Sequence, residues 1–174
     1  MRGFFSARET AMTFKTADLC DEFEAELGKT VRIVTPMFQH YGKRQRFSGE
    51  IVTLKVFEDN SLVREAFAEN GTGKVLVIDG GGSLRCALIG DQLAILAHKN
   101  GWEGAVAYGC IRDSADINGI DIGVCALNTH PQKSIKKGVG DCDIAVTFGG
   151  VTFNPGEFLY ADEDGVLVSN KALC

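Results

Sequence analysis

The sequence predicts an α/β fold in which a mixed β-sheet, helices and hairpins form layers within a single domain. Residues 74–113 alternate an apolar run, a glycine-rich turn, a helical pattern and a second apolar run, as a β-α-β unit does. Residues 143–169 then carry short apolar runs separated by turn signals, which are typical of antiparallel hairpins. Parallel strands joined by a helix and followed by hairpins indicate a layered fold with a mixed sheet.

Composition places the chain among globular proteins of one domain. Of its 174 residues, 45% are hydrophobic and 24% are charged, and the formal net charge is −5. The sequence has no basic block and no interleaving of aromatic with basic residues, so we expect no direct contact with nucleic acid. No apolar run approaches the ~20 residues that a membrane-spanning helix needs, so we expect no membrane partner either.

The cysteines and histidines argue against disulfides and zinc. The six cysteines form no CxxC pair and lie mostly in apolar runs, so we predict reduced and mostly buried thiols. Reduced thiols persist in a reducing compartment, which predicts a cytoplasmic protein. His40, His98 and His130 are isolated in the sequence, whereas a zinc site needs clustered ligands.

The first residues are expected to lie outside the domain, which we place at 16–174. Residues 1–15 form a predicted extension without regular structure. Residues 1–11 combine arginine, phenylalanine, serine and threonine with a single acid, Glu9, and so loosely fit an organellar targeting sequence. The alternative is an upstream start, with Met12 as a second initiating residue.

The N-terminal third of the domain predicts a helix followed by strands. An amphipathic helix is expected over residues 16–27, with Thr16 or Asp18 as its cap and Gly28 as its stop. The segments that follow are expected at 31–34 (strand), 37–46 (loop) and 47–57 (half-buried strand).

The middle of the chain predicts two helices between buried strands. Residues 58–60 are expected to cap the first helix, and Asn70-Gly71 to end it. Its apolar face is expected to carry Leu62, Val63, Ala66 and Phe67. The second helix is expected to run from Asp91 to Asn100-Gly101. The strands around the two helices are expected at 75–78, 105–108 and 120–127.

The last third predicts a loop and a series of short strands. Residues 131–140 read as a polar loop with three lysines, and Asp162 to Gly165 read as a hairpin turn. The strands are expected at 143–148, 150–153, 158–160 and 166–168.

The three consecutive glycines, Gly80 to Gly82, invite a phosphate-binding interpretation. The segment Gly80-Gly81-Gly82-Ser83-Leu84-Arg85 lacks the last glycine of the dinucleotide pattern, and no Walker lysine follows it. We therefore predict a tight turn, which also counts against a methyltransferase or dehydrogenase built on this loop.

The segment Gly90-Asp91-Gln92-Leu93 is the first candidate for chemistry. If the helix begins at Asp91, the amides of Gln92 and Leu93 lie in its first turn and have no helical acceptor. The helix dipole adds positive potential there, so a carboxylate or enolate oxygen can bind, and Gly90 leaves room for it. The alternative is an ordinary helix start, with Asp91 as its cap.

Arg112 and Asp113 follow the next strand and are the second candidate. Because both they and Asp91 stand at ends of elements, they can converge on one cleft. Arg112 can clamp a carboxylate, and Asp113 can bind a hard divalent cation such as Mg²⁺. The alternative is a local surface ion pair. Asp116, three residues further on, either supports Asp113 or caps the next turn.

In these candidate site residues and in five longer segments, the sequence resembles the RraA-like family. This family contains the regulator of ribonuclease E activity A and the metal-dependent 4-hydroxy-4-methyl-2-oxoglutarate aldolases. The resemblance extends roughly from Thr16 to Ser169. It rests on ADLCD (17–21), FSGEIVTLKVFEDN (47–60), GKVLVIDGGGSLRCALIGD (73–91), NGWEGAVAYGCIRD (100–113) and FGGVTFNPGEFLYADEDGVLVS (148–169).

The resemblance implies a β/β/α layered fold and a ring-shaped homotrimer with sites at subunit interfaces, and it leaves open whether trimers pair into hexamers. It implies that Gly90 to Leu93 hold a pyruvate moiety, that Arg112 binds its carboxylate and that Asp113 anchors the metal, Mg²⁺ or Mn²⁺. The implied function is a lyase that cleaves 4-hydroxy-4-methyl-2-oxoglutarate through a pyruvate enolate and also decarboxylates oxaloacetate. Asp91 is the candidate proton donor to the enolate carbon.

The alternative function is that of a protein regulator. Most of the matching text is closer to the regulator branch of the family, whose members inhibit a ribonuclease E-type partner without physiological catalysis. Regulators tend to lack the full set of Asp91, Arg112 and Asp113, so the presence of all three favours the enzyme.

Overall fold

The structure is a computed structural model that describes residues 13–174, so the predictions for residues 1–12 lie outside it. The strands are β1 (Val31–Ile33), β2 (Gln39–Tyr41), β3 (Phe47–Lys55), β4 (Lys74–Asp79), β5 (Ala87–Ile89), β6 (Gly104–Ile111), β7 (Gly123–Thr129), β8 (Asp141–Cys142), β9 (Val146–Phe148), β10 (Val151–Phe153), β11 (Phe158–Asp162) and β12 (Gly165–Ser169). The helices are α2 (Thr16–Glu22), the 3₁₀ turn η1 (Glu24–Glu26), α3 (Ser61–Ala68), α4 (Asp91–Lys99) and α5 (Ser114–Ile117).

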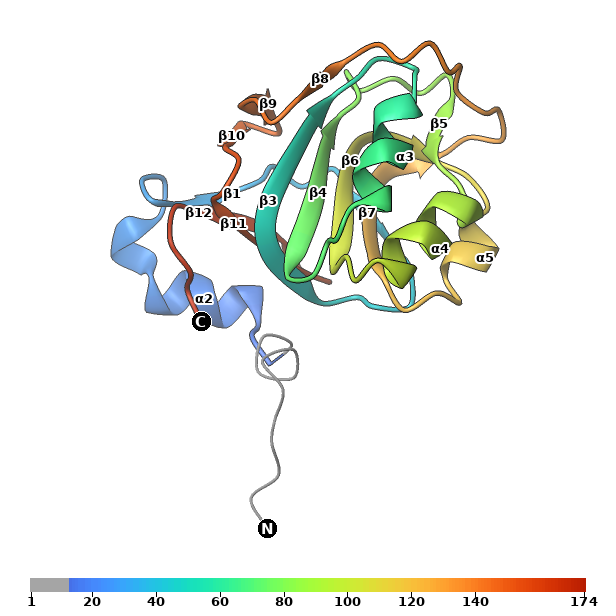
Figure 1. The fold of residues 1–174 in the computed structure, drawn as a ribbon. Coiled ribbons are helices and arrows are strands. Elements are labelled where there is room, and N and C mark those ends of the chain that lie inside the picture. Colours follow the sequence, from blue (N-terminus) through green and yellow to red (C-terminus); the bar gives the residue numbers. More distant parts are fainter. Residues whose placement is uncertain (1–12) are drawn as a thin grey trace.

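These elements form the predicted β/β/α layers (Figure 1). The main sheet has the order β1-β12-β11-β3-β4-β6-β7-β2, with β5 beside β6 and β8 beside β3. Helices α3, α4 and α5 cover one face of its central strands, where Phe67 and Leu93 join a core with Leu76. The opposite face packs against the β9–β10 hairpin and strands β11 and β12, around Val77 and Phe153. The fold is therefore a single α/β domain built on a mixed sheet.

The central strands β3, β4, β6 and β7 run parallel, and their order places the end of β6 near the start of α4. Residues 75–78 are fully buried because helices cover one face of β4 and strands cover the other. Strand β5 also runs parallel to β6, and the Arg112 amide donates a hydrogen bond to the Ile89 carbonyl at 2.9 Å. The residues after β5 and after β6 therefore lie side by side.

The N-terminal helix is shorter than the predicted 16–27. It ends at Glu22, the backbone leaves the helical region at Phe23, and a single 3₁₀ turn follows. The predicted local cap is also wrong, because the residue before the helix is Lys15 and no side chain caps it. Instead, the amide and hydroxyl of Thr16 donate to the Asp162 carboxylate at 2.7 and 2.6 Å. A residue distant in sequence thus satisfies the start of α2.

Phe14 precedes the predicted domain boundary at residue 16 but packs against the domain. The boundary itself stays a prediction. The Phe14 side chain is buried and meets the Tyr160 ring edge-on, with centroids 5.3 Å apart. Together with Leu19 and Leu167 it forms a small core between α2 and strands β11 and β12. At least this residue before Thr16 therefore packs against the domain.

Three short strands were not predicted. Strand β2 lies inside the expected loop at 37–46, β5 follows the glycine turn, and β8 follows the lysine-containing loop. Each has only two or three residues, so no periodicity shows in the sequence, and pairing with β7, β6 or β3 defines it. The strand expected from residue 143 begins only at Val146, because Asp143 adopts a left-handed backbone conformation (φ 56°).

All six cysteines lie in the described part of the chain and are free thiols. Cys86, Cys110 and Cys125 are buried and Cys20 is half-buried, but Cys142 and Cys174 are exposed, so the prediction of mostly buried thiols holds for only part of the set. Burial raises the pKa of the Cys125 thiol to about 12, which keeps it protonated. Within residues 13–174, no helix has the length and apolar character needed to span a membrane.

Candidate active site

The predicted site residues line one pocket of about 240 Å³, where β5 and β6 end and α4 begins. This pocket brings together residues from four separate segments of the chain. It is lined by Asn60, Arg64, Ala87, Gly90, Asp91, Gln92, Leu93, Arg112, Asp113, Lys133 and Lys136. The convergence of Asp91 with Arg112 and Asp113 thus agrees with the placement of all three at element ends.

Gly90 precedes α4 and is surrounded by the side chains of the site itself. A methyl group placed on Gly90 would lie 2.9 Å from Asp113 Oδ2 and 3.5 Å from Arg112 Nε. The backbone of Gly90 is extended (φ −116°, ψ −173°), a conformation open to any residue, so the requirement for glycine is one of space. The space beside Gly90, which we expected a ligand to occupy, is therefore taken up by the Asp113 carboxylate.

Asp113 has a left-handed backbone (φ 57°, ψ 38°), which is uncommon for a residue with a side chain and occurs often at functional sites. Its Oδ2 atom accepts a hydrogen bond from the Asp91 amide at 3.1 Å. The first residue of α4 therefore donates to Asp113, which places this carboxylate at the positive end of the helix dipole.

The amides of the first turn of α4 differ in availability. The Gln92 amide donates to Oδ1 of Asp91 at 2.8 Å, so a ligand oxygen would have to share or replace that bond. The Leu93 amide also lies in the first turn, where no helical carbonyl can accept its hydrogen. Of the two predicted amides, Leu93 is the better placed to receive an anion.

Arg112 lies beside Asp113 without a close ion pair between them. Its Nε atom is 4.0 Å from Asp113 Oδ2, and its Nη1 donates a long hydrogen bond of 3.5 Å to the Pro131 carbonyl. The Arg112 side chain is 39% exposed. This loose contact with Asp113 leaves the guanidinium able to form a bidentate contact with a carboxylate.

Five lining residues were not predicted to belong to the site: Asn60, Arg64, Ala87, Lys133 and Lys136. The sequence predicts that the lysines lie in a polar loop, but it does not show which part of the domain this loop packs against. Backbone hydrogen bonds from Ala87 to Gln132 (2.8 Å) and from Ile135 to Glu58 (3.0 Å) bring the loop to the pocket. The lining then has four cationic and two anionic side chains, a balance that favours a ligand with two negative charges.

Asp116 does not line the pocket. It lies in the first turn of the short helix α5, which Asp113 immediately precedes. The structure therefore gives no support to Asp116 as a partner of Asp113. The glycine turn meets its prediction, because the amides of Gly80 and Gly82 both donate to the Tyr108 carbonyl, each at 3.1 Å.

The donor set fits a hard divalent cation better than zinc. Residues 13–174 contain no cluster of three or more histidine, cysteine or acidic side chains able to hold a metal ion. The pocket instead offers the carboxylates of Asp91 and Asp113, and the Asp91 amide bonds only one oxygen of Asp113. One or two carboxylates with water completing the shell is the coordination that Mg²⁺ prefers.

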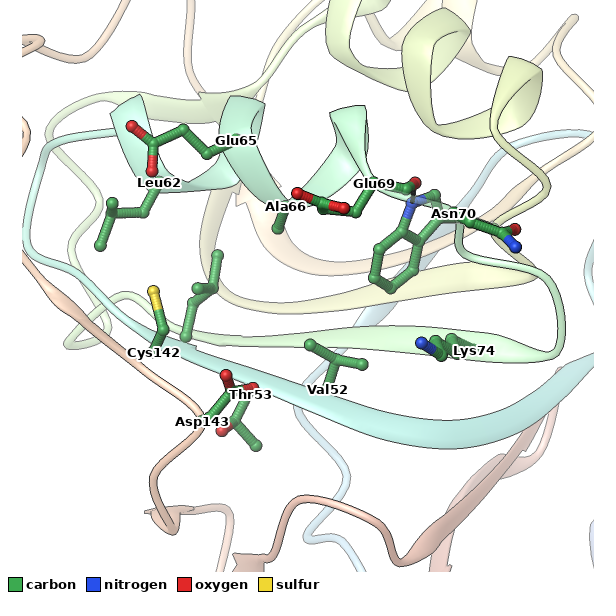
Figure 2. Close-up of a pocket in the computed structure, with 12 residues that line it drawn as sticks. Val52, Thr53, Leu62, Glu65, Ala66, Glu69, Asn70, Lys74, Cys142 and Asp143 are labelled. Atoms are coloured by element: carbon green, nitrogen blue, oxygen red, sulfur yellow. Dashed lines mark hydrogen bonds between the residues drawn. The ribbon is translucent and has the colours of Figure 1, made fainter.

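A second, larger pocket of about 580 Å³ lies between α3 and β3 (Figure 2). Glu65 on α3 and Glu69 directly after the helix lie on one side, and Val52 faces them from the strand. Asp143 lies at one end and Lys74 at the other, and none of the predicted site residues lines this pocket. The chemistry of Asp91, Arg112 and Asp113 therefore belongs to the smaller pocket.

A β/β/α domain with this acidic and Arg-Asp set at the ends of parallel strands defines the class of aldolase- and RraA-like proteins. A family model described as "RraA-like: Aldolase/RraA" matches residues 16–168. The chain belongs to this family.

Close relatives cover almost the whole chain. A protein of Dechloromonas aromatica is 84% identical over 162 residues, which is 93% of this chain and 99% of the relative. One from Aromatoleum aromaticum is 65% identical over 162 residues, again 93% of this chain and 99% of the relative. Both are provisionally named 4-hydroxy-4-methyl-2-oxoglutarate aldolases.

Solved structures share the fold but have other names. A Geobacillus kaustophilus protein described as an S-adenosylmethionine:2-dimethylmenaquinone methyltransferase has a TM-score of 0.88 and 51% identity, over 92% of this chain and 97% of that one. The RNA-processing inhibitor RraA from Thermus has a TM-score of 0.86 and 43% identity, over 92% and 94% of the two chains. The family therefore includes proteins named as enzymes and as regulators.

Proposed function

We propose that the protein is a divalent-metal-dependent lyase that acts through a pyruvate enolate. Its reaction is the cleavage of 4-hydroxy-4-methyl-2-oxoglutarate into two molecules of pyruvate, with oxaloacetate decarboxylation as a side activity. The observation that supports this most is the convergence of Asp91, Arg112 and Asp113 on one pocket. The names of the relatives that are 84% and 65% identical agree with it.

The residues of the pocket have separate roles in the proposed reaction. Arg112 binds the carboxylate next to the keto group, and the Leu93 amide, with that of Gln92, contributes positive potential at the end of α4. Asp113 holds the metal, Mg²⁺ or Mn²⁺, whose chemistry when bound is Lewis-acid stabilisation of the enolate oxygen. These groups favour the charge that develops during cleavage more than they favour the uncleaved substrate.

The bond changes follow from the substrate. The bond between C3 and C4 breaks as the C4 hydroxyl gives up its proton to a water molecule, and C4 becomes the keto carbon of one pyruvate. The electron pair of that bond forms the enolate of the other pyruvate. Asp91, through a water molecule, delivers the proton that C3 then needs. Loss of CO₂ from oxaloacetate gives the same enolate, so both reactions use the same residues.

The excess positive charge of the pocket supports a substrate with two carboxylates. Arg112 accounts for the first carboxylate, and Arg64, Lys133 and Lys136 remain for the second. Such a distribution disfavours substrates with an uncharged distal end, because three cations would stay without an anionic partner.

The metal-dependent step is tested by pyruvate release from oxaloacetate with Mg²⁺ or Mn²⁺, then with excess chelator. Because the metal alone decarboxylates oxaloacetate, the Asp113→Ala protein serves as the blank. We expect chelator-sensitive turnover at least about ten times that of the blank, since removing one preorganised electrostatic contact typically costs two to three orders of magnitude. Turnover equal to the blank would refute the proposal.

A homotrimer is the oligomer that we propose, with association through the surface beside the pocket. Phe57, Leu84, Ile135 and Val139 are between 51% and 64% exposed, and their segments meet around the lysine-containing loop. Such exposed apolar side chains are typical of a protein-protein interface. Light scattering should give the mass of a trimer, or of a hexamer if trimers pair, and a monomer would contradict the proposal.

The second candidate function is inhibition of a ribonuclease E-type enzyme, without physiological catalysis. The observation in its favour is the similarity to the Thermus RNA-processing inhibitor, at 43% identity over 92% of this chain. The formal charge of −5 suits a basic protein partner. An inhibition assay with purified ribonuclease decides it, and full ribonuclease activity at micromolar protein would exclude this role.

A further inference from the structure

Asp59 is a buried carboxylate that the mechanism above does not use. It is 2% exposed and lies between β3 and α3, in the segment before Ser61. Its Oδ1 atom accepts hydrogen bonds from the Ser61 amide (2.9 Å) and hydroxyl (2.7 Å). Its Oδ2 atom accepts from the amides of Lys137 (2.9 Å) and Val139 (3.2 Å). One carboxylate therefore links the start of α3 to the loop at 131–140.

The number of donors makes this link strong. Burial alone raises the pKa of Asp59, but the hydrogen bonds from Ser61, Lys137 and Val139 outweigh it and hold the pKa at about 2. Asp59 is therefore ionised at neutral pH, and all four bonds are made to a charged acceptor, which strengthens each of them. No other side chain of the described residues accepts from the amides of Lys137 or Val139.

The segment held in this way carries two of the cations of the active-site pocket. Lys133 and Lys136 line the pocket and are exposed, whereas the intervening Ser134 is buried. On the far side of Lys136 the loop depends on the Asp59 side chain, with one further bond from the Gly138 amide to the Ser61 hydroxyl at 3.1 Å. The place of Lys136 is thus set one residue away from an Asp59 contact.

We propose that Asp59 is a positioning residue that fixes the lysine-containing loop beyond Ile135, so that Lys136, together with Lys133, binds the distal carboxylate of the substrate. The inference rests on the proposed function for the identity of the substrate, but the anchoring of the loop does not. Asp59 selects for dicarboxylic 2-oxo acids through these lysines and does not touch the reacting carbons.

The test compares wild type with Asp59→Asn, in which an amide NH₂ must face either the Ser61 donors or the loop amides. Asp141→Asn is the matched control, since it removes one charge near the same loop from a side chain that is exposed. Binding of 2-oxoglutarate, with two carboxylates, and of pyruvate, with one, is measured with Mg²⁺ by calorimetry. We expect Asp59→Asn to weaken 2-oxoglutarate about tenfold and pyruvate less than about twofold.

A readout independent of the substrate is hydrogen exchange at the amides of Lys137 and Val139. In Asp59→Asn both should exchange at least about ten times faster, while amides in the core of β4 keep their wild-type rates. Unchanged exchange at both amides, or equal weakening of 2-oxoglutarate and pyruvate, would overturn the inference. If wild type binds neither acid, the proposed function fails. Hydrogen exchange then still tests whether Asp59 anchors the loop.

Discussion

At the residue scale, the site depends on the backbone conformation of Asp113 and on the absence of a side chain at Gly90. Asp113 takes a left-handed conformation, and its carboxylate turns back to the Asp91 amide at 3.1 Å. Gly90 leaves the space that this carboxylate and the Arg112 side chain occupy. The position of the proposed metal ligand is therefore set by a residue that has no side chain.

Gly90→Ala should reduce activity much more than stability. The added methyl group would lie 2.9 Å from Asp113 Oδ2, which is the mobile end of a side chain and can move away. We expect kcat/KM for oxaloacetate to fall at least about tenfold, since the carboxylate leaves its place at the α4 N-terminus. The melting temperature should stay close to that of wild type, because Gly90 has an extended backbone. Wild-type kcat/KM would contradict the role given to this glycine.

The ionisable residues of the site could be predicted because each stands where an apolar run ends. Asp91 opens a helical pattern and Arg112-Asp113 close a strand, and parallel strands bring such ends together. The contribution of Arg64, Lys133 and Lys136 could not be predicted, because it depends on how a loop packs on α3. The left-handed backbone at Asp113 likewise does not show in the residue pattern.

At the scale of elements, Trp102 fixes the packing of α3 against the sheet. It is 3% exposed, its indole N–H donates to the Glu69 carbonyl at 3.1 Å, and its ring meets Phe67 edge-on. The chain crosses this ring at Gly71, where a methyl group would lie 2.1 Å from ring atoms. The end of α3 and the start of β4 are thus held together by one side chain.

Gly71→Ala should therefore destabilise the fold. Because the Trp102 ring is enclosed and cannot turn away, the overpacking should lower the free energy of unfolding by about 1–3 kcal/mol. Urea denaturation measures this loss. Gly119→Ala is the matched control, since its added methyl group would meet only the Asp116 carbonyl, at 3.4 Å. Equal stability of the two variants would contradict the proposed packing.

The long elements could be predicted from the sequence, but the short ones could not. Strands β3 and β4 and helix α4 have clear periodicity or long apolar runs, and their predicted positions agree with the structure. Strands β2, β5 and β8 have two or three residues and depend on pairing with distant partners. Helix α2 is shorter than predicted because the backbone leaves the helical region at Phe23 and a 3₁₀ turn follows.

At the scale of the whole molecule, two buried carboxylates connect distant segments and make the fold sensitive to acid. Asp59 joins α3 to the lysine-containing loop, and Asp162 joins α2 to strand β11. Burial opposes ionisation of Asp162, but hydrogen bonds from Thr16 and from the Asp164 amide outweigh it, so its pKa is also lowered. Both groups favour the folded state only while they are ionised.

The free energy of unfolding should therefore fall as the pH falls. Since both carboxyls have a lower pKa in the folded protein than the ordinary 3.8, their contribution is complete above about pH 5. It is lost progressively from there towards pH 2, the pKa of Asp59. Urea denaturation at pH 7, 5 and 3.5 measures this change. With both residues replaced by asparagine, the pH dependence should be flatter, and an unchanged slope would contradict the account.

The most direct test of the central claim is pyruvate release from 4-hydroxy-4-methyl-2-oxoglutarate, with Mg²⁺, by wild type and by the Arg112→Ala and Asp113→Ala variants. Light scattering must first show that the three proteins have the same oligomeric state. We predict two pyruvates per substrate for wild type, and kcat/KM lower by at least about a hundredfold in each variant. Full activity in either variant would contradict the assignment of the site to Asp91, Arg112 and Asp113.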